Sequence, residues 1–272
     1  MKQPRKRSIT KLFLIILLLV TFITVLWLIW GKTFIYSNLI DSAEQEIMED
    51  LLIDANIPAE NIDRYMEKIE RFYSIPYKGI VQSGWKRSSI VLFSYRDNSA
   101  IEHFDEQPDF SLSCRAAAFI LLKDNITWGE VNLPAITKKD EISRTHISDN
   151  QEDLLHFDLL FSNIDGIPIS SSEQLVETLT QYWHNSQIDF GEGNVHLVTA
   201  YASEGTKIEN WHTAISIFAD GKVWLLEKYN PIYPFQLSCF DGEEDMVAYM
   251  KKRLSGAKYA AVLSDTHYLW MK

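Results

Sequence analysis

Cys114 is the residue of this sequence whose type and position best suit it to nucleophilic chemistry. It stands in Ser111–Lys123, where a polar stretch changes into an apolar run that predicts a helix beginning near the cysteine. A thiol in the first turn of a helix lies at the positive end of the helix dipole, which favours the thiolate. Because the thiolate is the reactive form of cysteine, this placement indicates a nucleophile for acyl chemistry.

A base for this thiol follows from the register of a predicted hairpin. Asp220-Gly221 separates two apolar stretches, and this dipeptide is a strong signal for a two-residue turn. With that turn, His212 and Glu227 become diagonal neighbours on one face of the sheet, within side-chain reach. A slip of one residue would place them on opposite faces. A carboxylate beside the ring orients the imidazole and stabilises its charged form, as a general base requires.

Each of these residues also has an ordinary structural interpretation. Taken alone, Cys114 is more typical of a small buried apolar residue, His212 of a packed strand residue, and Glu227 of a surface ion pair; the combination of the three favours a site. Asn230 is an alternative to Glu227 as the group that orients the histidine, and Gln236 is a candidate donor to an oxyanion.

The second cysteine and the histidine spacing limit the other chemistries. Cys239 alternates with Phe235 and Leu237, so we expect it to be buried on a strand. A Cys114–Cys239 disulfide is the alternative, and it would exclude Cys114 as a nucleophile. The seven histidines show no metal-ligand spacing, and the sequence contains no P-loop or dinucleotide fingerprint. We therefore expect neither a metal nor a cofactor.

The elements that must position these residues divide the chain into a helical first part and a strand-rich second part. Helices are predicted over 41–56, from 58 onward, over 114–124 and 151–161, and from 170 and 241 onward. Strands are predicted over 89–95, 194–202, 211–219, 222–229, 234–240 and 258–263, with a surface loop over 132–150. Helices followed by antiparallel strands indicate an α+β fold, with the N-terminal helices packed on the sheet.

The N-terminus predicts a membrane anchor. Residues 1–11 are basic and form a predicted cytoplasmic tail, and residues 12–30 contain two threonines as their only polar side chains. Nineteen helical residues reach roughly 28 Å, close to the hydrocarbon thickness of a bilayer. A cleaved signal peptide is the alternative, but the Trp30–Phe34 exit is a poor cleavage site. We expect a stalk over 31–40 and one extracellular domain over 41–272.

The charge balance narrows the class of partner. The first 32 residues hold six of the 26 basic residues and none of the 37 acidic ones, so the remainder carries a net charge of −17. A nucleic acid is therefore not an expected partner, because no basic patch offsets phosphate charge. The membrane contact is assigned to residues 12–30. Location alone suggests a peptide, a cell-wall component or a protein as the substrate.

The chain order of cysteine, histidine and a polar orienting residue resembles the papain-like superfamily. A narrower resemblance spans roughly residues 36–254 and is to an uncharacterised family of Gram-positive surface proteins, known as domain of unknown function 4300. It rests on these segments: Tyr36–Asp41, Cys114–Asp124, Trp211–His212, Asp220–Lys228 and Pro234–Gln236.

That resemblance implies an extracellular domain with a Cys–His pair and supplies no substrate. Position by position, it places the family's cysteine on Cys114, its histidine on His212 and its Glu-Lys pair on Glu227 and Lys228. The residues that precede the cysteine and the histidine depart from the family pattern, being Ser113 and Trp211. The bulky Trp211 is expected to narrow the approach to His212.

Together these features predict a membrane-anchored extracellular cysteine hydrolase of the peptidase or amidase type, with Cys114, His212 and Glu227 as its catalytic residues. Two alternatives remain. One is a non-catalytic surface module that binds a protein or glycan, and the other is a transglutaminase-like acyltransferase with the same order of residues.

Overall fold

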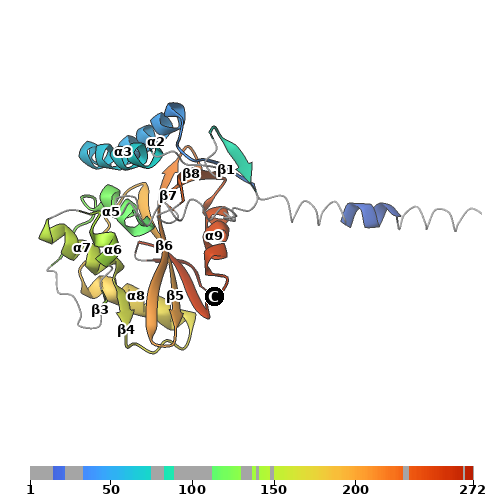
Figure 1. Ribbon diagram of the computed structural model, residues 1–272. Coiled ribbons are helices and arrows are strands. Elements are labelled where there is room, and N and C mark those ends of the chain that lie inside the picture. The colour runs from blue at the N-terminus through green and yellow to red at the C-terminus, as the bar shows by residue number, and fades with distance from the viewer. Residues whose placement is uncertain are drawn as a thin grey trace, which may run out of the picture.

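The computed structural model describes residues 15–21, 33–74, 83–88, 112–129, 137–138, 141–147, 150–228, 233–265 and 267–271 (Figure 1). Its labelled helices are α2 (Ser42–Asp54), α3 (Ala59–Tyr73), α5 (Cys114–Leu122), α6 (Glu141–Arg144), α7 (Gln151–Phe161), α8 (Ser172–Asn185) and α9 (Glu243–Lys251), which continues into the 3-10 turn η2 (Lys252–Leu254). Its strands are β1 (Phe34–Ser37), β2 (Lys86–Ser88), β3 (Thr137–Lys138), β4 (Asn163–Asp165), β5 (Val195–Glu204), β6 (Lys207–Ala219), β7 (Lys222–Lys228), β8 (Phe235–Phe240), β9 (Tyr259–Ser264) and β10 (His267–Met271).

The described strands form one antiparallel sheet, which confirms the predicted α+β class. The order along the sheet is β10-β9-β5-β6-β7-β8-β1-β2, and β4 pairs with β6 and carries β3. The long strands β5, β6 and β7 occupy the centre, where they are paired on both edges. Central strands hold their side chains in fixed positions, so this is where residues for a site are best positioned.

Helices cover both faces of the sheet. One core lies on the side of α2, α3, α5, α7 and α8, and it includes Phe119, Trp183 and Leu226. The second core lies under α9 and includes Val223, Leu225 and Met246. Figure 1 shows α9 on the opposite side of the strands from α5 to α8. Alternation along β7 sends successive side chains to the two cores, as expected for a strand buried on both faces.

The predicted hairpin register is confirmed. Ala219 pairs with Lys222, and the ladder between β6 and β7 continues to the pair Ile215 and Leu226. Asp220 and Gly221 have φ values of 52° and 69°, and two consecutive positive φ values characterise the type I′ turn that matches strand twist. The turn therefore sets which residues of β6 and β7 share a face.

Two predicted segments differ from the structure. Residues 34–37, expected in a stalk, form β1, which pairs with β8 and β2 and brings Phe34 onto Phe240. The sheet therefore begins at Phe34, because burying these apolar side chains outweighs leaving them extended in water. Part of the segment predicted as a loop over 132–150 forms β3 and α6. The predicted strand over 89–95 lies outside the described residues.

Most of the predicted membrane anchor over 12–30 also lies outside the described residues. Within it, residues 15–21 are helical, and the Thr21 hydroxyl donates to the Leu17 carbonyl. Among the residues that the structure describes, no helix has the length and apolarity needed to cross a membrane.

Candidate functional site

The helix that carries the cysteine begins where a serine caps it. Ser113 is extended, with φ −78° and ψ 164°, and its hydroxyl accepts from the Ala116 backbone N–H at 3.1 Å. Ser143 on α6 donates to the same hydroxyl at 2.7 Å. Cys114 is consequently the first residue of α5, and the cap fixes its position at the positive end of the helix.

His212 owes its orientation to an irregularity in β6. Ala200 of β5 pairs with His212, but the next residue of β5, Tyr201, pairs with Asn210, so Trp211 is the extra residue of a β-bulge. The two neighbours have opposite environments, since His212 is 1% exposed and Trp211 is 44% exposed. Bulges re-aim side chains and are frequent beside active sites. The bulge therefore turns the histidine inward and leaves the indole in solvent.

The start of α5 meets β6 and β7 just beyond the last pair of their ladder. α5 contacts both strands, and the ladder between them ends at Ile215 and Leu226. Two residues beyond Ile215, the Thr213 backbone N–H donates to the Cys114 sulfur, and His212 forms a side-chain hydrogen bond with the same sulfur. The thiol thus lies against β6, close to the end of the ladder between the two strands.

Glu227 holds the other side of the histidine. Its Oε2 lies 2.6 Å from Nε2 of His212, and both side chains are buried. Because Nε2 faces the carboxylate, Nδ1 is the ring nitrogen left for the Cys114 sulfur. The structure therefore brings together the three residues that the sequence singled out, in the order thiol, imidazole, carboxylate.

The surroundings of Glu227 include groups that the sequence did not identify. Nη2 of Arg253 lies 2.5 Å from Oε2, and the Tyr249 hydroxyl donates to Oε1. Arg253 also donates to the Tyr249 oxygen at 2.9 Å. Arg253 lies on η2 and Tyr249 on α9. Both residues therefore come from the elements that cover the α9 face of the sheet. Their spacing of four residues places them on one side of the helix, but nothing local relates them to a glutamate on β7.

Gln236 does not have the role predicted for it. Its Nε2 donates to Glu227 Oε1 at 3.3 Å and to Ser238 Oγ at 2.7 Å, and it also lies 3.2 Å from the Tyr249 oxygen. The amide nitrogen is therefore engaged in the carboxylate network on the α9 face rather than directed at an oxyanion. Asn230, the alternative orienting residue, lies outside the described residues.

The electrostatics of Cys114 and His212 favour a negative thiolate beside a positive imidazolium. Burial raises the pKa of the Cys114 thiol, but the His212 hydrogen bond, the charges of His212 and Arg115 and the Thr213 N–H outweigh burial and lower it. For His212, burial and Arg253 lower the pKa, and the bonds to Cys114 and Glu227 outweigh them and raise it. Opposite shifts in a hydrogen-bonded thiol and imidazole favour the thiolate–imidazolium form.

Glu227 remains ionised throughout the physiological range. Burial opposes ionisation, yet Arg253, the hydrogen bond and charge of His212, and the Tyr249 hydroxyl together lower the pKa of Glu227 to about 2. A carboxylate has about four lone-pair positions, and the donors around Glu227 come from β6, β8, α9 and η2. The carboxylate is therefore a fixed acceptor that stabilises the imidazolium without taking its proton.

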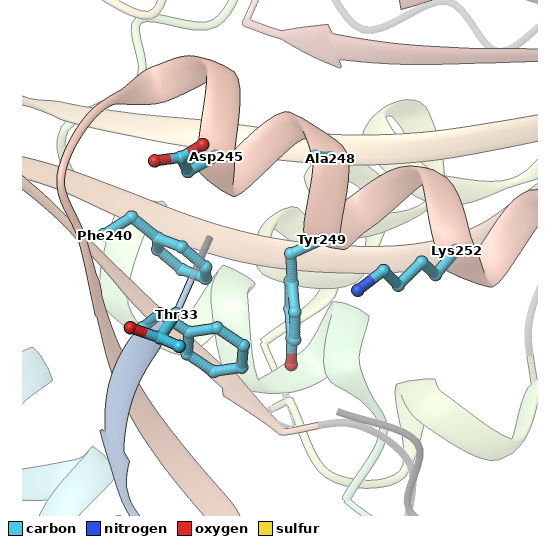
Figure 2. A pocket seen from close by; sticks show the side chains of 7 residues that line it. Thr33, Phe240, Asp245, Ala248, Tyr249 and Lys252 are labelled. Carbon is cyan, nitrogen blue, oxygen red and sulfur yellow. The ribbon is translucent and has the colours of Figure 1, made fainter. Parts of the chain in front are cut away.

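A shallow pocket lies behind this carboxylate, on the α9 face. Figure 2 shows Tyr249 descending from α9 into it, opposite Phe240 and beside Lys252. Phe34 stacks on Phe240 with ring centroids 4.8 Å apart and meets Tyr249 edge-on. This aromatic packing fixes the ring of Tyr249, whose hydroxyl then reaches Glu227.

The other residues that the sequence singled out lie away from the site. Cys239 is a free, partly buried thiol on β8, and burial raises its pKa. Cys114 is also free, so the described structure contains no disulfide between them. Lys228 is buried on the opposite face from Glu227, where its ammonium lies 3.9 Å from the ring centroid of Phe72. No group of three or more His, Cys, Asp or Glu side chains among the described residues could hold a metal ion.

Comparison with known proteins identifies a family for most of the chain. The model of a family described as a domain of unknown function, DUF4300, matches residues 35–261, a stretch that contains Cys114, His212 and Glu227. No curated protein matches the chain. No solved structure matches it either.

Proposed function

The chain belongs to the DUF4300 family, and from the geometry of its site we propose that it is a cysteine hydrolase that cleaves peptide or other amide bonds. The observation that carries this proposal is the continuous series of hydrogen bonds from the Cys114 thiol through His212 to Glu227. A nucleophile bonded to a base, with the base oriented by a third group, is the arrangement used for covalent catalysis.

In the first step, the Cys114 thiolate attacks the carbonyl carbon of the amide, forming a C–S bond and moving the carbonyl π electrons onto oxygen. The backbone N–H of Cys114 is available to this oxyanion, because the first N–H groups of a helix have no acceptor within it. As the tetrahedral intermediate collapses, the C–N bond breaks and His212 gives its proton to the leaving amine.

In the second step, water attacks the carbonyl carbon of the thioester while His212 accepts a proton from that water. The C–S bond then breaks, the carboxylic acid product leaves, and the thiolate and imidazolium are restored. Glu227 keeps the ring in one orientation through both steps, because its carboxylate stays ionised and is fixed by Arg253.

The contrast between the two cysteines supports an enzyme over a binding module. A thiol that only packs is expected to have its pKa raised by burial, as that of Cys239 is. Cys114 is more deeply buried, yet its pKa is lowered. This difference needs the specific partners at Cys114, which packing alone does not require.

The proposal also includes the setting of the domain. A cysteine at a helix start, a histidine on a central strand and a later acidic residue support a papain-like arrangement. The apolar segment 12–30 after a basic tail supports a single-pass anchor with the domain outside the cell, as in a Gram-positive surface protein. In that location the substrate would be a peptide, cell-wall or protein amide.

The proposal is tested by alkylating the full-length chain, purified in detergent, with iodoacetamide across a range of pH. Peptide mass spectrometry follows both cysteines in the same sample. Cys114 is expected to react rapidly at about pH 6, where a thiol with an ordinary pKa is mostly protonated. His212→Ala is expected to slow Cys114 by about tenfold or more at that pH, because it removes the stabilising imidazolium.

Cys239 provides an internal control, because it reports any general opening of the fold. Its alkylation should be slow at pH 6 and unaffected by His212→Ala. If Cys114 stays unreactive until the chain is unfolded in urea, the hydrolase proposal is wrong. Equal rates for Cys114 and Cys239 at all pH values would also contradict it.

A further inference from the structure

A cluster of hydrogen-bond donors lies immediately beside the Cys114 thiol. It consists of Arg115, Asn210 and Tyr201 and is called here the donor cluster. Nη1 of Arg115 lies 3.4 Å from the Asn210 carbonyl oxygen, and Asn210 pairs directly with Tyr201 across β5 and β6. The positive charge of Arg115 favours the ionised forms of both Cys114 and Tyr201, although burial raises the pKa of Tyr201 overall. The guanidinium is therefore near both the thiol and the phenol.

The amide of Asn210 is oriented so that its nitrogen faces this cluster. Its Oδ1 accepts from the Thr213 hydroxyl at 3.0 Å, which leaves Nδ2 directed toward Tyr201. Asn210 is 7% exposed, and Nδ2 has no acceptor with good hydrogen-bond geometry in the described structure. A buried donor without an acceptor costs free energy, and such exceptions are concentrated where a ligand completes the hydrogen bonding.

The cluster is electropositive as well as rich in donors. One acidic group on a neighbouring helix is Asp158 of α7, whose charge acts on Tyr182, and Tyr182 in turn acts on Tyr201. That carboxylate forms an ion pair with Arg144, so its charge is balanced. At the thiol, the charge of Arg115 adds to that of His212, and both lower the pKa of Cys114.

We propose that the donor cluster binds a carboxylate of the substrate, so that the amide cleaved by Cys114 belongs to a peptide with an acidic group close to the scissile bond. This inference rests on the proposed hydrolase function and names its substrate class. Two residues separate Asn210 from Thr213, whose backbone N–H contacts the sulfur, and the Thr213 hydroxyl donates to Asn210 Oδ1 at 3.0 Å. A carboxylate bound at the cluster therefore lies close to the scissile amide.

The substrate reaches the cluster past Trp211. Arg115 is the only residue of α5 that is not buried, and Trp211 is the exposed residue next to Asn210 in the bulge. Both side chains are therefore accessible to a substrate, the indole as an apolar surface and the guanidinium as a source of charge-assisted hydrogen bonds to a carboxylate.

The test compares two alkylating probes that react with the same thiolate. Both are bromoacetyl amino-acid amides of equal length, one with an aspartate side chain and one with an asparagine side chain. In each case the thiolate displaces bromide. The ratio of the two rates is therefore independent of the thiolate fraction, which a variant can change. The full-length chain in detergent is expected to react about tenfold faster with the aspartate probe.

Two variants locate the source of this preference. Arg115→Gln removes the positive charge, and Asn210→Asp keeps the acceptor for Thr213 while replacing the Nδ2 donor with a second carboxylate oxygen. Arg115→Gln is expected to bring the rate ratio close to one, and Asn210→Asp is expected to reverse it in favour of the asparagine probe. Arg64→Gln removes a surface arginine paired with Glu60 on α3 and should keep the wild-type ratio.

The iodoacetamide rate separates failure of this inference from failure of the proposed function. Rapid reaction with iodoacetamide and equal rates with the two probes would overturn the carboxylate site and leave the hydrolase proposal intact. A preference that persists in both Arg115→Gln and Asn210→Asp would also overturn it, because His212 alone would then account for the attraction. Slow reaction with iodoacetamide refutes the proposed function itself.

Discussion

Replacing Arg253 with methionine tests whether the buried carboxylate of Glu227 depends on its ion pair. Arg253→Met keeps much of the side-chain volume but removes the guanidinium that lies 2.5 Å from Glu227 Oε2. The glutamate side chain is fully buried, and the arginine side chain is 6% exposed. Breaking a buried pair by removing one partner costs about 3–5 kcal/mol, because a buried charge is left without compensation.

The same pair determines how stability depends on pH. The folded-state pKa of Glu227 is lowered from 4.5 to about 2, so its ionisation stabilises the fold above pH 4.5. At about 1.36 kcal/mol per pH unit this amounts to roughly 3 kcal/mol, which is lost as the pH falls from about 4.5 to about 2. In Arg253→Met, protonation of Glu227 instead removes an uncompensated buried charge. The difference in free energy of unfolding between the variant and wild type should therefore become smaller in acid.

The assay is urea unfolding of the full-length chain in detergent, followed by tryptophan fluorescence at pH 7, 5 and 3. The free energy of unfolding of Arg253→Met is expected to be lower than wild type by about 3–5 kcal/mol at pH 7, with a smaller gap at pH 3. Arg253→Lys, which keeps the charge but not the planar donor group, should lie between the two. Equal stability at pH 7, or a gap that does not change with pH, would refute this account of Glu227.

Three other substitutions test separate parts of the site. Ser143→Ala removes the hydroxyl that donates to the capping Ser113. We expect it to lower the free energy of unfolding by about 1 kcal/mol and to slow the reaction of Cys114 with iodoacetamide. Unchanged values would show that the cap does not need the Ser143 hydroxyl. Trp211→Ala should change the free energy of unfolding by less than about 0.5 kcal/mol and leave the rate of Cys114 alkylation by iodoacetamide unchanged, because the indole is exposed. A marked acceleration of that alkylation would mean that the indole covers the thiol. Burial lowers the pKa of Lys228 below its ordinary value of 10.5, so the folded wild type is penalised below that pH and gains stability as the pH rises toward it. The stability of Lys228→Met relative to wild type should therefore fall as the pH rises from 7 to about 10, and a pH-independent difference in urea unfolding would contradict this account.

Much of the site followed from short-range sequence features. The Asp220-Gly221 turn sets the register of β6 and β7, and through it the shared face of His212 and Glu227. The change from polar to apolar residues at Cys114 predicts the helix start, and Ser113 caps it as a residue of its type should. Turn geometry and helix capping depend on a few neighbouring residues, so they can be inferred without knowing the rest of the fold.

Long-range packing decided the remainder. The sequence has no signal that α9 and η2 place Tyr249 and Arg253 on Glu227, or that Phe34 joins the sheet instead of a stalk. The bulge at Trp211 is equally non-local, because it is a mismatch between β5 and β6 rather than a property of either strand. Such contacts depend on which elements meet when the whole core packs, and the apolar periodicity of one segment does not record its partner.

The positions of the thiol, the imidazole and the carboxylate in their own elements were therefore determined by the sequence, because local turn and helix chemistry places them. Their meeting was decided only by the tertiary structure, because the start of α5 reaches β6 and β7 just where the ladder between them ends. The charge of Glu227 is stabilised by residues from the opposite face of the sheet, which only the folded chain brings within hydrogen-bond distance.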